Sequence, residues 1–142
     1  MSTRWRWAIG LGCAAVVIYL TSTTLITQRQ LARFVASVMP GVTEDGFFEW
    51  WQTWWWVFVK GFHVTEFFVL TLVAGFALRR FGVKRWLLYG ALTAVVYAIS
   101  DEWHQTFVTG RGGRATDVLI DCIGVSLAVL VLRWRLKESA TS

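Results

Sequence analysis

Long apolar runs alternate with short polar segments along this chain, and the runs have the length of membrane helices. Four runs can be drawn: Trp5 to Ile26, Val57 to Leu78, Arg85 to Thr106, and Thr116 to Arg135. Each is close to the roughly 20 residues that a helix needs to cross a bilayer. Since a chain in lipid must satisfy its own backbone hydrogen bonds, this pattern predicts an all-α membrane protein. We expect four transmembrane helices in a compact bundle, formed by residues 1–142 as a single domain.

The first run also fits a second interpretation, because Arg4 and Arg6 precede its apolar stretch as they would in a signal peptide. No clear cleavage site of two small residues flanking a third follows the run. A retained transmembrane helix is therefore favoured over a cleaved leader.

Composition supports a membrane protein, since 56% of the 142 residues are hydrophobic and only 16% are charged. The net charge of +5 could suggest a nucleic-acid partner, but the bases flank apolar runs and form no recognisable nucleic-acid motif. Cys13 and Cys122 lie inside apolar runs, which favours neither a disulfide framework nor a zinc site. We therefore expect membrane lipids as partners and no nucleic acid.

The distribution of charge predicts the orientation in the membrane. With the amino terminus inside, every acid except Glu138 falls on the outer side. The positive-inside rule then places both termini in the cytoplasm of a bacterial inner membrane. The cytoplasmic segments hold most of the 14 bases, namely Arg4, Arg6, Arg79, Arg80, Lys84, Arg85, Arg133, Arg135 and Lys137.

The external segment between the first two runs is rich in tryptophan. Met39-Pro40-Gly41 predicts a turn, and the sequence FFEWWQTWWW follows it at Phe47 to Trp56. Indole rings favour the headgroup region, so we expect a short helix lying in the outer interface. A lid or entry surface for an amphiphilic substrate is the alternative.

Polar side chains gather where three of the runs meet the outer face. An ionisable group near hydrocarbon costs roughly 2.5 to 3.5 kcal/mol on insertion scales and usually faces the interior of a bundle. Spacings of three or four residues place side chains on neighbouring positions of a helix, so these sets are expected to converge. They are Lys60, His63 and Glu66 in the second run, Asp101, Glu102 and Gln105 in the third, and Asp117 and Asp121 in the fourth.

The two adjacent acids of the third run point about 100° apart on a helix, so Asp101 is expected inward with Gln105, and Glu102 is expected to cap or pair locally. His104 is expected at the surface. Thr109 to Arg114 predicts a flexible turn in which Arg111 either pairs with an aspartate or binds an anionic headgroup. Small residues from Gly124 to Ala128 predict close helix contacts, within the bundle or between copies.

These positions together resemble the VanZ-like family of small membrane proteins. Lys60-x-x-His63 is similar to a family motif, and Asp101-Glu102-x-x-Gln105 resembles its acidic motif. Arg111 and Asp117 fall where the family has an arginine and an aspartate. The sequence departs from the pattern at Asp121 and Phe67, where asparagine and tyrosine are common. The family takes its name from a protein linked to teicoplanin resistance, so the resemblance implies a role in the cell envelope.

Two function classes follow from this site. In the first, an outward-facing pocket binds and acts on an anionic lipid-linked envelope substrate, which Lys60, Gln105, Arg111, Asp117 and Asp121 contact. The candidates for catalysis are His63, Glu66, Asp101 and Glu102. In the second, the protein is a non-enzymatic binding or assembly module that alters envelope properties.

Other functions are less favoured. The ionisable groups crowd at one end of the helices, whereas an ion pathway needs them through the whole membrane depth. A metal held by His63 and carboxylates would be a variant of the enzyme, but no His-Glu-x-x-His motif is present and no metal site is predicted. The sequence indicates neither a particular cofactor nor a stoichiometry.

Overall fold

The computed structural model describes residues 2–23, 28–109 and 112–141, and this part of the chain contains five helices and no strand. They are α1 (Thr3–Thr23), α2 (Gln28–Val38), α3 (Glu44–Arg80), α4 (Trp86–Gln105) and α5 (Ala115–Thr141). The all-helical prediction is confirmed. The predicted end of the first run at Ile26 lies outside the described residues.

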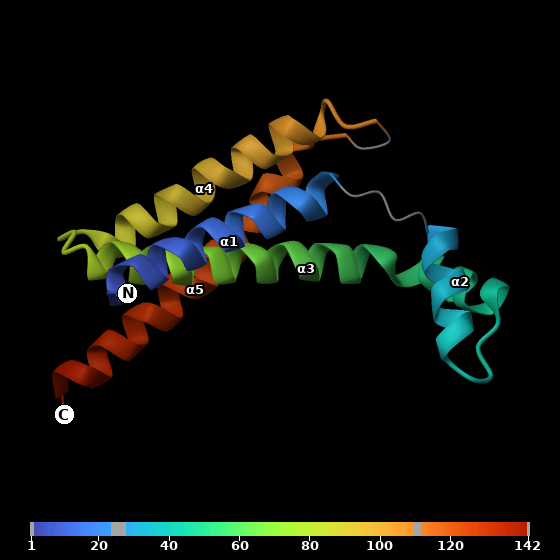
Figure 1. Cartoon of the computed structure of the whole chain (residues 1–142), viewed down its shortest axis with the longest axis horizontal. Coiled ribbons are helices and arrows are strands. Elements are labelled where there is room, and N and C mark those ends of the chain that lie inside the picture. The colour runs from blue at the N-terminus through green and yellow to red at the C-terminus, as the bar shows by residue number, and fades with distance from the viewer. Residues whose placement is uncertain (1, 24–27, 110–111, 142) are drawn as a thin grey trace.

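α1, α4 and α5 pack around α3, and along the chain each of α1, α3, α4 and α5 reverses the direction of the one before it (Figure 1). The start of α1, the turn from α3 to α4 and the last turns of α5 lie at one end, while the end of α4 and the start of α5 lie toward the other. α3 contacts α1, α2, α4 and α5, so it is the central helix of the fold.

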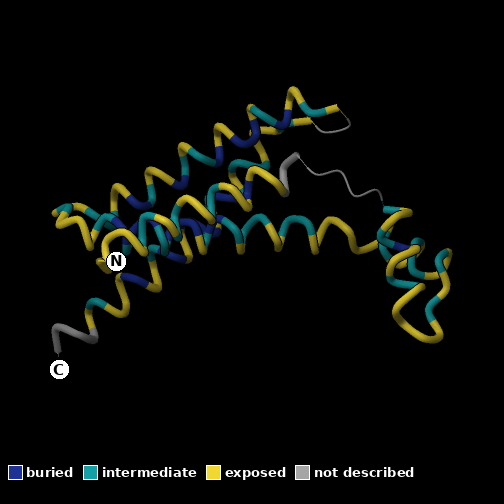
Figure 2. Tube along the Cα trace, viewed as in Figure 1, coloured by how far each residue is buried: buried dark blue, intermediate teal, exposed yellow. Residues whose placement is uncertain are grey.

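Small residues bring the central helices together. Ala74, Ala94 and Ala98 are fully buried, and a Cβ on Gly90 of α4 would lie only 2.8 Å from the Gly75 Cα atom of α3. Phe67 and Leu70 fill the remaining space against α1 and α5. The buried residues line the surfaces where the helices meet, and the outer surfaces are exposed (Figure 2). Close approach through small residues is the packing expected of helices in lipid.

Two helices are long and apolar enough to cross a membrane by length and composition, α3 and the part of α5 from Ala115 to Lys137. The sequence pattern predicted four such helices. α4 falls short because its last two turns carry Asp101, Glu102, His104 and Gln105. Large apolar side chains such as Val96, Leu119 and Leu130 are more than half exposed, which is the surface that lipid would cover.

The tryptophan-rich segment differs from its prediction. Phe47 to Trp56 is not a separate interfacial helix, because it forms the first part of α3. Thr43 caps the start of the helix, because its hydroxyl accepts a hydrogen bond from the Gly46 amide. No glycine or proline interrupts the helix between Gly46 and Lys60. At about 1.5 Å per residue, the 37 residues of α3 extend roughly 55 Å, well beyond the ~30 Å hydrocarbon core of a bilayer.

The sequence pattern also missed α2, which packs beside the start of α3 and away from the bundle (Figure 1). Its Ala32 is fully buried, and its Arg33 Nε atom lies 3.3 Å from a carboxylate oxygen of Glu44. The turn between the two helices is the one predicted around Met39-Pro40-Gly41, and Gly41 adopts a φ of 84° there.

Candidate functional site

The polar residues of α3, α4 and α5 meet inside the bundle, as their spacing predicts. Lys60 of α3 forms an ion pair with Asp117 near the start of α5. Their side chains are 30% and 22% exposed, so water still reaches the pair. One turn further along both helices, the pattern repeats with a histidine and a second aspartate.

His63 Nδ1 lies 3.3 Å from Asp121 Oδ1, in a second contact between α3 and α5. Asp121 is completely buried, and His63 is 15% exposed. The contact has the distance of an ion pair but not the alignment of a hydrogen bond. Among the described residues, neither Asp121 carboxylate oxygen accepts a hydrogen bond. Such a buried group is costly and is often part of a functional site.

Glycine makes this contact between α3 and α5 possible. A Cβ on Gly124 would lie 2.1 Å from the Val64 carbonyl oxygen, far inside any allowed contact. Gly124 and Asp121 lie three residues apart on one face of α5, and Val64 follows His63 directly. The small-residue positions Gly124 and Ala128 therefore contribute to packing inside the chain. Ala128 is fully buried, so these two positions are already covered within the chain.

α4 contributes a group of two carboxylates and an amide. The Gln105 side-chain nitrogen donates to Asp101 Oδ2 at 2.8 Å and to Glu102 Oε1 at 3.4 Å. Glu102 also accepts a hydrogen bond from the Arg114 backbone amide at 2.7 Å, which ties the turn before α5 to the end of α4. Gly113 allows this approach, because a Cβ there would lie 1.9 Å from the Glu102 carbonyl oxygen.

The contacts of the two adjacent acids of α4 agree with their expected positions, because Asp101 lies inward with Gln105 and Glu102 bonds locally to the Arg114 amide. Asp101 and Glu102 are both buried, at 4% and 5% exposure. Their directions differ on the helix, but the loop that packs over the end of α4 covers Glu102, and Gln105 bridges both carboxylates. Sequence reasoning could not foresee which side the loop would cover.

The α3–α5 pairs and the α4 group form one electrostatic cluster. Glu66, half-buried on α3, and Asp101 both lie within electrostatic reach of the His63 imidazole. Glu102 is in turn within reach of His63 and Asp117. We name this set the polar cluster; it comprises Lys60, His63, Glu66, Asp101, Glu102, Gln105, Asp117 and Asp121. Arg111, predicted to join it, lies outside the described residues.

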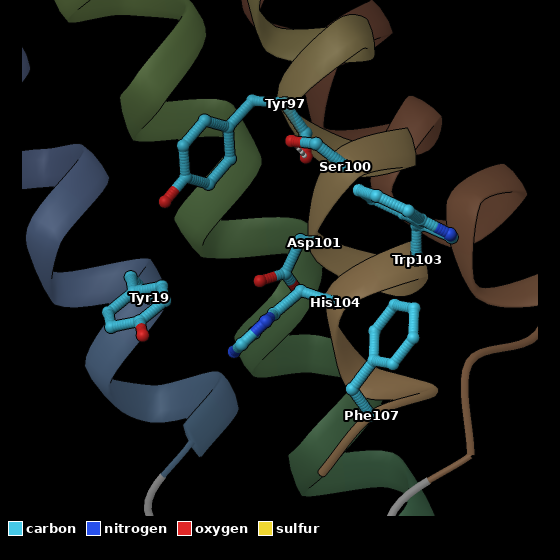
Figure 3. A pocket seen from close by; sticks show the side chains of 7 residues that line it. All are labelled: Tyr19, Tyr97, Ser100, Asp101, Trp103, His104 and Phe107. Atoms are coloured by element: carbon cyan, nitrogen blue, oxygen red, sulfur yellow. Dashed lines mark hydrogen bonds between the residues drawn. The ribbon is translucent and has the colours of Figure 1, made fainter.

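A cavity of about 410 Å³ opens beside the cluster on the side of α1 (Figure 3). Asp101 and His104 point from α4 toward Tyr19 of α1 in this view, and Tyr97 lines the same space. Asp101 is the residue that the cavity shares with the polar cluster. The lining is mainly aromatic, which differs from the polar pocket that the sequence predicts.

His104, expected at the surface and not in catalysis, is less exposed than that expectation suggests. It is half-buried, and its ring stacks on Tyr19 with the ring centres 5.0 Å apart. Its Nε2 atom is buried without a hydrogen-bond partner among the described residues. The spacing of Asp101 and His104, three residues apart on α4, is the signal that could have placed it inward.

No group of three or more histidine, cysteine, aspartate or glutamate side chains is arranged to hold a metal ion within the described part of the chain. Cys13 is exposed and Cys122 is partly buried, and both are free thiols. The chemistry available in the cluster is therefore that of carboxylates, an imidazole, an amide and an ammonium group.

A scan of family models gives the decisive comparison, because the model for VanZ/LLP1 matches residues 7–136. The chain belongs to the VanZ/LLP1 family. The match confirms the resemblance seen in the sequence and extends from α1 into the later part of α5. For a VanZ/LLP1 protein, a cell-envelope role with a link to glycopeptide resistance is a consistent assignment, and the two apolar helices fit a membrane location. Searches of curated proteins and of solved structures gave no match.

Proposed function

We propose that the polar cluster binds an anionic, lipid-linked substrate of the cell envelope and acts on it by acid–base chemistry. The contact between His63 and the buried Asp121 carries this proposal. A carboxylate beside Nδ1 attracts an imidazolium by its charge, and Nε2 is then the atom that accepts or donates a proton. Histidine is the side chain best suited to this exchange near neutral pH.

The cost of burying Asp121 supports a role beyond packing. An ionised carboxylate without hydrogen bonds is expensive in a low-dielectric interior, so a protonated histidine beside it gains stability. Glu66 and Asp101 add negative potential at the same imidazole. In this proposal His63 delivers a proton to a leaving oxygen of the substrate.

In this proposal an anionic substrate first meets Lys60, because this cationic side chain of the polar cluster is 30% exposed. A phosphate would compete with Asp117 for the ammonium group and would form charge-assisted hydrogen bonds to it. In this proposal Arg111 supplies a second cation, while Gln105 and Asp117 position the substrate. His63, Glu66, Asp101 and Glu102 are the candidates for proton transfer.

The distribution of bases supports placing the cluster at the outer face, with both termini in the cytoplasm of a bacterial inner membrane. The part of α3 that precedes Lys60 carries exposed tryptophans. They are Trp50, Trp54, Trp55 and Trp56, which are 39–56% exposed. Tryptophans at this level favour lipid headgroups. An amphiphilic substrate would therefore reach the cluster along the start of α3.

The ion pair and hydrogen bonds among other members of the polar cluster favour a second function. The Lys60–Asp117 pair joins α3 to α5, and Gln105 links Asp101 and Glu102 by donating a hydrogen bond to each. These contacts need no substrate. They would equally serve a non-enzymatic module that binds or assembles in the membrane and alters envelope properties.

Native mass spectrometry with a lipid extract separates the two functions. The purified protein is incubated with the extract, and both retained lipids and new products are recorded, for the unchanged protein and for His63→Ala. His104→Ala is a matched control, because it removes the other of the two histidines in the chain. The enzyme proposal predicts a retained anionic lipid that is converted, with conversion lost in His63→Ala alone. Retention without conversion by the unchanged protein would select the module.

A further inference from the structure

Three bases surround a second cavity, at the opposite end of α4 from the polar cluster. The cavity has a volume of about 330 Å³ and lies between α4 and α5. Lys84 and Arg85 reach it from the turn before α4, and Arg133 reaches it from α5. No carboxylate is among the described residues that line it. The described lining of the cavity therefore carries positive charge and no negative charge.

The side chains of these bases have no acidic partner among the described residues, in contrast to two bases elsewhere in the chain. Lys60 pairs with Asp117, and Arg33 pairs with Glu44. Lys84, Arg85 and Arg133 form no such pair. Like charges that converge on one cavity repel each other, and an anion placed among them relieves that repulsion.

The rest of the lining is apolar and comes from both helices. Trp86, Leu88 and Val129 line the same cavity as the bases. The Trp86 ring is held against α3 at Gly75, where a Cβ would lie 3.3 Å from it, so this wall of the cavity is fixed. A free phosphate ion would use the bases alone, whereas a phospholipid would also use the apolar wall.

We propose that this cavity binds an anionic phospholipid. The phosphate and headgroup lie among Lys84, Arg85 and Arg133, and an acyl chain follows Leu88 and Val129 along the groove between α4 and α5. Basic pockets between membrane helices recognise anionic headgroups through this combination of charge and apolar contact. The site is separate from the polar cluster, and the inference does not rest on the function proposed for that cluster.

Native mass spectrometry with lipids of defined headgroup tests the proposal. Phosphatidylglycerol and phosphatidylcholine with identical acyl chains are offered to the full-length protein, with and without inorganic phosphate as competitor. We expect retention of phosphatidylglycerol over phosphatidylcholine and about fivefold weaker retention in Arg133→Gln, since each base near a headgroup contributes about that factor. Lys84→Gln and Arg85→Gln should act in the same direction.

Arg80→Gln is the matched control, because it removes one charge at the same end of the bundle from a residue that does not line the cavity. Circular dichroism of each variant confirms that the helices remain. Equal loss in Arg80→Gln and Arg133→Gln would overturn the proposal, since it would reflect diffuse attraction alone. Equal retention of both lipids by the unchanged protein would also overturn it, as would complete displacement by inorganic phosphate.

Discussion

Gly124 of α5 lies against the Val64 carbonyl oxygen of α3. The contact leaves no room for a side chain, because a Cβ atom on Gly124 would lie 2.1 Å from that oxygen. This backbone contact is immediately beside the His63–Asp121 pair. The distance between the two ionisable groups is thus set by the absence of a side chain at a neighbouring position.

Gly124→Ala is therefore expected to destabilise the protein by about 2 kcal/mol, because α3 and α5 must separate to admit the methyl group. Thermal unfolding in detergent measures this change. Gly12→Ala is the control, since a Cβ on Gly12 meets nothing within 4 Å. Equal melting temperatures for the two variants would contradict the close contact.

The ion pair between Lys60 and Asp117 predicts non-additive mutations. Lys60→Met and Asp117→Asn should each cost about 1–3 kcal/mol, because each leaves the other group unpaired in a largely enclosed position. The double variant should be more stable than the sum of the two losses predicts. Chemical or thermal unfolding of the four proteins in one detergent gives the coupling energy. Strict additivity would mean that the pair contributes nothing.

Asp121→Asn separates stability from chemistry. The amide removes a buried negative charge, so the melting temperature should stay level or rise by a few degrees. Under the proposed enzyme function, turnover should fall about tenfold or more, because the neutral amide no longer stabilises a protonated His63. Parallel unfolding and lipid-conversion assays test this. A variant with lower stability and full turnover would contradict both expectations.

Glu44→Ala should loosen α2 without unfolding the bundle. Glu44 lies within ion-pair distance of Arg29 and Arg33, but both arginines are more than 60% exposed. Exposed pairs contribute less than about 1 kcal/mol, so the melting temperature should barely change. Hydrogen exchange should become faster in α2 and stay unchanged in α4. Protection of α2 equal to that of the unchanged protein would show that Ala32 packing alone holds it.

The sequence pattern predicts the position of a side chain best where helical spacing and burial both point it toward the bundle interior. The spacing of Lys60 and His63 on one helix, and of Asp117 and Asp121 on another, predicts that these side chains converge, and the structure adds which of them pair. It could not name the Arg114 amide as the group that bonds Glu102, because the loop that covers the end of α4 is a tertiary feature. It also broke α3 at Trp56, since a run of tryptophans marks an interface by composition but does not end a helix.

α3 is one unbroken helix that connects three parts of the molecule. One end of this rod carries the tryptophans and α2, its middle carries Lys60 and His63, and its far end contacts Trp86 through Gly75 and Phe76. A rod longer than the bilayer core adjusts to membrane thickness by tilting. Because Gly124 holds the backbones of α3 and α5 in contact, the two helices would tilt together, and a change in membrane thickness would change the depth of the His63–Asp121 pair in the bilayer and not its internal distance.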